Sequence, residues 1–111
     1  MGIKYDLNKR LYTQVEGSTT ETLDYVPAAG EKILFVNFGC SSSAVPSTAA
    51  CVVWDPDGTP EVLISSYSEI IHVNVGIEKL GDGVKIVRIC LTNDLTEPAS
   101  MGAFWQAEIL Q

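Results

Sequence analysis

A turn followed by a run of β-branched residues occupies positions 79–94, which read KLGDGVKIVRICLTND. Two glycines ahead of a lysine suggest a loop that holds phosphate, but such a loop needs the spacing Gly-x-x-x-x-Gly-Lys-Ser/Thr and a following helix. That spacing is absent, and the residues that follow are typical of a β-strand. Asp82 and Gly83 tolerate the positive φ angles of a tight turn. We therefore expect a β-hairpin that joins 75–80 to 84–91.

The same pattern continues along the chain. Short runs of residues that favour β-strands are separated by Gly, Pro, Asp, Asn and Ser about every eight to twelve residues. No segment has an apolar period of 3.6 residues over a helical length. The pattern predicts an all-β protein with eight strands, at 10–15, 21–26, 32–38, 48–55, 61–67, 70–75, 84–93 and 103–110.

Eight antiparallel strands in a chain of 111 residues favour a β-sandwich of the jelly-roll type. An immunoglobulin-like sandwich is the alternative, because Cys40, Trp54 and Cys90 occur in the order typical of that fold. Their spacing is short for it, however, and Cys51 lies only three positions before Trp54. We expect one domain over residues 10–111, preceded by an extended N-terminal arm at residues 1–9.

Two of the expected strands are apolar on both faces, which is typical of central strands whose second face is also covered. These are 33–36 and 84–90, the latter interrupted only by Lys85 and Arg88. The neighbours Phe104 and Trp105 must point to opposite sides of their strand. We expect Trp105 in the core and Phe104 in a subunit contact or on a covered second face.

The charge balance limits the choice of partner. Fourteen acidic and seven basic residues give a net charge of −7, which opposes binding to nucleic acid. The longest apolar run, 33–36, is far too short to cross a membrane, and no signal peptide is visible. A neutral or cationic protein surface is the expected partner.

Three cysteines cannot all pair within one chain, and none belongs to a Cys-x-x-Cys motif. We expect Cys40, Cys51 and Cys90 to be buried free thiols. A disulfide between Cys40 and Cys51 on adjacent strands is the alternative, which their spacing does not settle.

The sequence offers little for catalysis or for metal binding. Residues 55–59, DPDGT, predict a turn in which Gly58 takes the left-handed conformation, and they resemble a fragment of a calcium loop that lacks its other acidic ligands. No Gly-x-Ser-x-Gly motif or catalytic triad is present, and His72 is expected at the surface. We therefore predict a protein that is not an enzyme and has no cofactor. A carbohydrate site is harder to exclude, since it needs only an exposed aromatic ring and a few polar groups.

Several segments together resemble a known class of protein. They are 26–31 (VPAAGE) before a long strand, 53–58 (VWDPDG), 81–85 (GDGVK) and the final Phe104-Trp105 strand. In this layout the chain resembles small β-sandwich virion proteins of tailed bacteriophages, in particular capsid decoration (cement) proteins and the base domains of head fibres. The resemblance implies a protein made in the host cytoplasm that assembles, often as a trimer, on the outer capsid surface. There it would bind the major capsid protein and stabilise the shell.

Under this interpretation the N-terminal arm would contact the capsid, and aromatic residues would pack the subunits together. The expected contact residues are Ile3, Tyr5, Leu7 and Lys9 in the arm, with Tyr12, Phe38 and Phe104 between subunits. Two alternatives stay open, a tail or fibre module of a virion and a carbohydrate-binding β-sandwich module.

Overall fold

The computed structural model describes residues 3–42, 48–66 and 71–110. These ranges form eight strands and contain no helix, so none that is long and apolar enough to cross a membrane. The strands are β1 (Ile3–Val15), β2 (Thr19–Tyr25), β3 (Lys32–Ser42), β4 (Thr48–Trp54), β5 (Glu61–Ser66), β6 (Ile71–Leu80), β7 (Val87–Asn93) and β8 (Ala99–Leu110). The prediction of an all-β chain with eight strands is confirmed.

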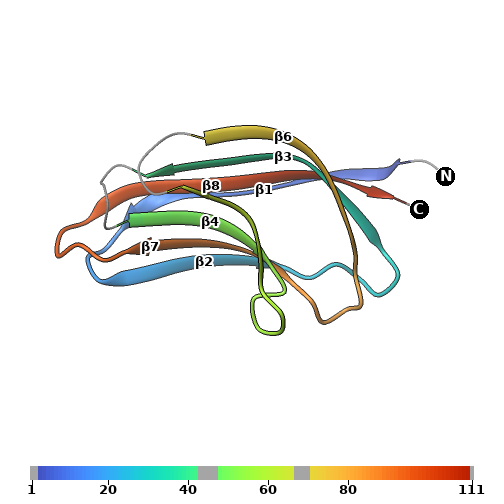
Figure 1. The fold of residues 1–111 in the computed structure, drawn as a ribbon, viewed down its shortest axis with the longest axis horizontal. Coiled ribbons are helices and arrows are strands. Elements are labelled where there is room, and N and C mark those ends of the chain that lie inside the picture. The colour runs from blue at the N-terminus through green and yellow to red at the C-terminus, as the bar shows by residue number, and fades with distance from the viewer. Residues whose placement is uncertain (1–2, 43–47, 67–70, 111) are drawn as a thin grey trace.

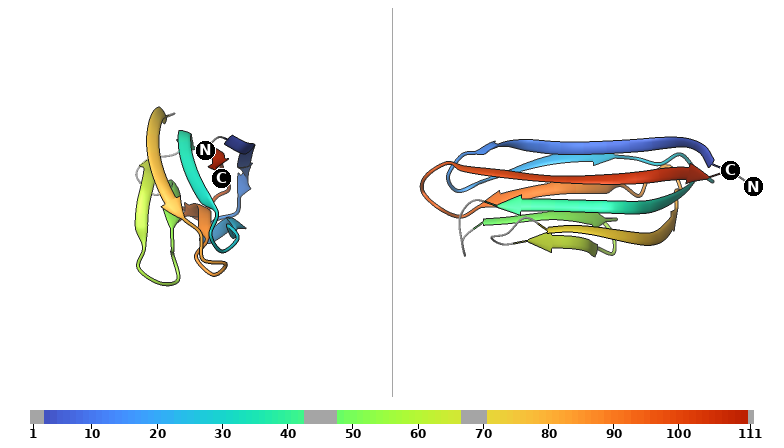
Figure 2. Two further views of the ribbon diagram at one scale, coloured as in Figure 1. Left: turned by 90° about the vertical axis from the view of Figure 1, so that its right-hand side faces the viewer. Right: turned by 90° about the horizontal axis from the view of Figure 1, so that it is seen from above.

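The strands form two antiparallel sheets that pack face to face (Figure 1). The first sheet has the order β1-β8-β3-β6 and the second sheet the order β2-β7-β4-β5. Strand β1 pairs with β8, β2 with β7, β3 with β6 and β4 with β5, so the first half of the chain runs antiparallel to the second. This is the wrapping of a jelly roll, and it differs from the strand order of an immunoglobulin-like sandwich. Figure 2 shows the two layers end-on and from above.

The core lies between the two sheets and follows the alternation of the strands. Along β7 every second residue is buried, as expected for a central strand. Trp105 packs edge-on against Phe35 at 5.4 Å between ring centroids, and Phe35 stacks on Phe38 at 5.3 Å. Trp105 is thus a core residue, as predicted. Removing such a buried ring costs about 3–5 kcal/mol.

Strand β1 is longer than the sequence suggested. Residues 3–9, expected to be an arm outside the domain, are the first part of β1 and pair with β8 from Ile3 opposite Leu110 onward. The expectation of an arm outside the domain is wrong for these residues, because their backbone pairs with β8, with a register shift between Ile3 and Tyr5. Polar residues such as Asp6 and Asn8 interrupt the apolar pattern of this segment, which is why the sequence did not indicate a strand at the edge of a sheet.

The turn at Gly81–Gly83 is present, but it does not make the expected hairpin. It connects β6 in the first sheet to β7 in the second sheet, so the chain crosses between layers there. Its backbone pairs instead with the β2–β3 connection: the Gly81 N–H donates to the Glu31 carbonyl (2.7 Å) and the Gly83 N–H to the Pro27 carbonyl (3.2 Å). Gly83 has the positive φ expected of it, +80°.

The turn between β4 and β5 is a hairpin turn, as the sequence predicted for residues 55–59. The Gly58 N–H donates to the Asp55 carbonyl at 3.1 Å, and the Asp55 carboxylate accepts the Thr59 N–H at 3.0 Å. The left-handed residue is Asp55, with φ of 54°, and not Gly58. Aspartate tolerates this conformation better than most residues, so the left-handed position can lie three residues before the expected one.

Candidate functional site

The outer face of the first sheet carries two aromatic side chains. In β8 the residues Ala103, Trp105 and Ala107 are buried in the core, so Phe104 and Gln106 point outward between them. Tyr12 of β1 lies on the same outer face and is 52% exposed. We call this surface, made of Arg10, Tyr12, Phe104 and Gln106, the aromatic face.

Each of these two rings lies over a glycine of the neighbouring strand. Gly102 is opposite Tyr12 and Gly39 is opposite Phe104 in the sheet register. A Cβ atom at either glycine would overlap the ring that covers it. Because both glycines lack a Cβ atom, the two rings can pack directly against the backbone of the sheet. Partial burial there raises the pKa of Tyr12.

Amide groups border the aromatic face. The Asn37 side chain of β3 donates a hydrogen bond to the Gln106 side chain of β8 at 2.8 Å. Asn8 of β1 lies opposite Gln106 on the other side. Aromatic rings and side-chain amides thus share one side of the sheet, a combination that serves both protein and sugar recognition.

The other predicted contact residues lie elsewhere. Phe38 is fully buried in the core and offers no surface to a partner. Leu7 packs against the core, and the Lys9 ammonium lies 5.6 Å from the centroid of the Tyr25 ring of the second sheet. Ile3 and Tyr5 belong to β1, but their side chains fall outside the described part of the structure. Leu7 and Lys9 thus lie on the body of the sandwich, and their proposed contact with a capsid stays a prediction.

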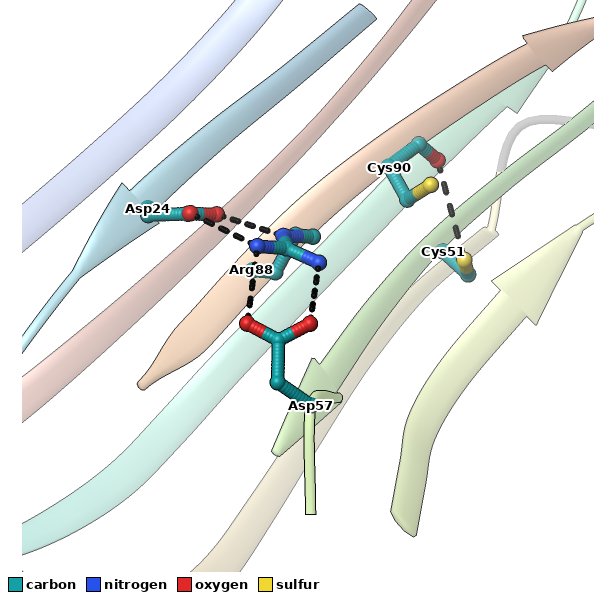
Figure 3. A network of polar contacts seen from close by, with 5 residues as sticks. All are labelled: Asp24, Cys51, Asp57, Arg88 and Cys90. Carbon is teal, nitrogen blue, oxygen red and sulfur yellow. Dashed lines mark hydrogen bonds and ion pairs between the residues drawn. The ribbon is translucent and has the colours of Figure 1, made fainter. Parts of the chain in front are cut away.

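The outer face of the second sheet holds an ion-pair cluster that the sequence did not predict (Figure 3). Arg88 of β7 makes a two-pronged contact with Asp24 of β2, from Nε to Oδ1 at 2.8 Å and from Nη2 to Oδ2 at 3.0 Å. Asp57 of the β4–β5 turn accepts from the same guanidinium at 3.3 and 3.4 Å. The hydrogen bond with Asp24 is the main cause that raises the pKa of Arg88. Arg88 is thus neutralised within its own chain.

Two cysteines lie beside this cluster. Cys51 of β4 is directly opposite Cys90 of β7, and both are partly buried, whereas Cys40 is buried. All three thiols are free, as predicted, but Cys51 and Cys90 are less buried than expected. The partner of Cys51 across the sheet is Cys90 and not Cys40, because β4 pairs with β7 and β3 belongs to the other sheet.

The acidic residues of the suspected calcium fragment are engaged within the protein. Asp55 accepts a backbone N–H in its own turn, and Asp57 pairs with Arg88. Among residues 3–42, 48–66 and 71–110 no group of three or more His, Cys, Asp and Glu side chains is placed to hold a metal ion. His72 lies in β6, where the side chain is outside the described part.

Comparison with known proteins yields a structural likeness alone. No protein-family model and no curated protein sequence matches the chain. Among solved structures it is similar to the crystal structure of dimeric latent PorU from Porphyromonas gingivalis, with a TM-score of 0.44 and 11% identity. The likeness covers 98% of this chain but only 13% of that one, so this chain spans a small part of the length of the protein it matches. A likeness this distant carries no argument about activity or partners.

Proposed function

We propose that the protein is a non-enzymatic structural protein of a virion, which binds the outer surface of an assembled capsid and stabilises it. The observation that carries this proposal is the aromatic face. Tyr12 is 52% exposed and is not part of the core. Aromatic side chains are enriched at the centres of protein interfaces. The resemblance to capsid decoration proteins of tailed bacteriophages suggests the partner, the major capsid protein.

The proposed mechanism is stabilisation by mass action. A protein that binds the assembled lattice but not free capsid subunits shifts the equilibrium toward the shell. Each occupied site contributes about 2.7 kcal/mol when the free concentration is about 100 times the dissociation constant. Assembly as a trimer would place three aromatic faces around the local three-fold points of an icosahedral lattice.

The test is binding of the purified protein to expanded capsids that lack it, followed by co-sedimentation and thermal release of the genome. We expect Tyr12→Ala and Phe104→Ala each to weaken binding by about tenfold or more. The matched control is Val84→Ala, which removes an apolar side chain that is 78% exposed in the β6–β7 connection. This control should bind like the unmodified protein.

Two results would contradict the proposal. If the unmodified protein neither binds the capsids nor raises their release temperature, decoration is wrong. If it binds and both alanine variants bind equally well, the aromatic face is not the contact surface. Binding to tails or fibres instead of capsids would assign the protein to the alternative virion position.

A carbohydrate-binding module is the second candidate, and it is favoured by the amides beside the rings. Tyr12 and Phe104 could stack on sugar rings while Asn37 or Gln106 binds hydroxyl groups. A glycan array with saturable binding that is lost in Tyr12→Ala would support this function over capsid decoration. A flat response across the array would exclude it for the sugars displayed.

A further inference from the structure

Cys51 and Cys90 face each other across the centre of the second sheet. They are register partners on β4 and β7, and the next pair in the register, Val52 and Ile89, is fully buried in the core. Because side chains alternate along a strand, both thiols stand on the outer face (Figure 3). The Cys51 Sγ lies 3.6 Å from the Cys90 carbonyl oxygen, so it already reaches across to the partner strand.

The backbone spacing of such a pair suits a disulfide. Residues directly opposite in an antiparallel pair have Cα atoms about 4.5–5.5 Å apart. Disulfides bridge Cα atoms that are about 4.4–6.8 Å apart. Closing a bond between these two sulfurs therefore needs rotation of the side chains and a small local approach of the two strands.

The surroundings also activate one of the two thiols. A hydrogen bond from the Cys51 thiol, helped by the Thr92 hydroxyl and the Arg88 guanidinium, lowers the pKa of Cys90 to about 6. The same contact, together with burial, raises the pKa of Cys51. Of the two, Cys90 is thus the thiol that loses its proton more readily. The thiolate is the form that attacks disulfides.

Cys40 provides an internal contrast. It points into the core between the sheets, and burial raises its pKa to about 12. A buried thiol of this kind is unreactive. Chemistry at the surface pair should therefore leave Cys40 untouched.

We propose that Cys51 and Cys90 are a redox-active dithiol, which closes to a cross-strand disulfide by exchange with a small-molecule or protein disulfide. In the first step the Cys90 thiolate attacks one sulfur of that disulfide, its S–S bond breaks, and one thiolate leaves. Cys51 then loses its proton to solvent and attacks the Cys90 sulfur, which expels the second thiolate. Counted from two thiols, with the Cys90 proton lost before the first step, the two cysteines lose two electrons and two protons, and the external disulfide is reduced to two thiolates that take up protons from solvent.

The closed bond joins the two central strands of the second sheet. A reducing compartment keeps the pair open, and an oxidising one closes it. The switch concerns the stability of the sheet and does not depend on the proposed capsid function.

The test is incubation of the native protein with oxidised glutathione at pH 7.5, followed by acid quenching, intact mass measurement and a non-reducing peptide map. We expect a loss of two hydrogens and a peptide pair that joins Cys51 to Cys90. The thermal midpoint should rise by about 10 °C and return when a reductant is added. Cys40→Ala is the matched control and should form the same bond.

Single variants separate the two roles. Cys51→Ser should stop at a stable glutathione adduct on Cys90, without the rise in thermal midpoint. Cys90→Ser should leave Cys51 at least about tenfold slower to react, because its thiol is mostly protonated. Both positions are on the outer face, and circular dichroism shows whether each variant is folded.

The pH dependence of alkylation tests whether Cys51 activates Cys90. If the two cysteines only packed against each other, the midpoint for Cys90 would not depend on Cys51. The rate of Cys90 alkylation by iodoacetamide should have a midpoint near pH 6 in the unmodified protein. The midpoint should move up toward the ordinary thiol range in Cys51→Ala, which has no side-chain donor, whereas the hydroxyl of Cys51→Ser can still donate to Cys90. The charged or titratable groups that face Cys90 are Cys51 of β4, Arg88 of β7 and Asp24 of β2.

The proposal is wrong if glutathione adducts persist on Cys51 and Cys90 of the unmodified protein without a bond between them. It is equally wrong if the bond forms between molecules or includes Cys40, or if the alkylation midpoint of Cys90 is the same in Cys51→Ala.

Discussion

Asn93 secures the end of the sandwich where β1 and β7 finish. Its side chain is fully buried and donates to the Val15 carbonyl at 2.9 Å and to the Glu97 carbonyl at 2.8 Å. Its side-chain oxygen accepts the Leu95 N–H at 2.9 Å. One amide therefore satisfies three backbone groups, one at the end of β1 and two in the β7–β8 connection, which explains how a polar residue is accommodated in the core.

Replacing Asn93 with alanine should lower the free energy of unfolding by about 3 kcal/mol, because the variant leaves two carbonyls and one N–H without partners. Urea denaturation measures this change. The matched control is Asn37→Ala, which breaks a hydrogen bond at the surface and should cost about 0.5 kcal/mol. Equal losses in the two variants would contradict the assigned role of Asn93.

The two ion pairs of Arg88, with Asp24 and with Asp57, should contribute unequally to the free energy of unfolding. Asp24→Asn should cost about 1 kcal/mol because it breaks the short two-pronged contact, and Asp57→Asn should cost about 0.3 kcal/mol because that contact is longer and more exposed. Denaturation at low and at high salt measures both, and the difference should shrink in high salt. A larger loss for Asp57→Asn would reverse this assignment.

At the scale of elements, Asp82 holds the connection that carries the chain from β6 to β7. Its carboxylate accepts the Lys85 N–H at 2.7 Å and the Val84 N–H at 2.9 Å, and these bonds lower the pKa of Asp82. A carboxyl group with a lowered pKa stabilises the folded state above its ordinary pKa. That contribution is lost as the pH falls through the folded-state value.

Asp82→Ala should therefore be less stable than the unmodified protein at pH 6, and the two should converge as the pH falls below about 4. Thermal unfolding measured between pH 2 and pH 6 tests this. A stability difference that stays constant over the whole range would show that the side chain acts by other means than its charge.

Strand positions could be predicted from the sequence, but strand partners could not. Alternation and turn residues located all eight strands, since both depend on neighbours in the chain. The chemistry of Asp82 and Gly83 indicates that the chain turns, yet it does not say to which sheet the next strand belongs. For the same reason the sequence missed the pairing of Cys51 with Cys90, which lie on strands far apart in the chain.

The aromatic face was partly predictable. Adjacent Phe104 and Trp105 had to point to opposite sides, and the sequence assigned the core to Trp105. The prediction that Phe38 lies at a subunit contact is wrong, because its side chain points into the core. The sequence alone does not show which face of β3 is covered by the core. The glycines beneath Tyr12 and Phe104 become meaningful only with the sheet register.

At the scale of the whole molecule, the topology makes folding slow. The first strand pairs with the last and the second with the seventh, so the sheets need contacts between distant parts of the chain. Jelly rolls of this size are expected to fold in milliseconds to seconds. Stopped-flow refolding followed by tryptophan fluorescence measures the rate, and a microsecond phase that recovers the full signal would contradict the expectation.

The two ends of the described chain leave the molecule side by side. Ile3 lies opposite Leu110, at one end of a body 48 Å long (Figure 1). A pull between these ends would peel β1 from β8 one residue pair at a time, so each hydrogen bond would meet the force alone. A pull along the sheets from opposite ends would load all the pairs of a strand together. Attachment at opposite ends of the sheets is therefore mechanically stronger than attachment at the two termini.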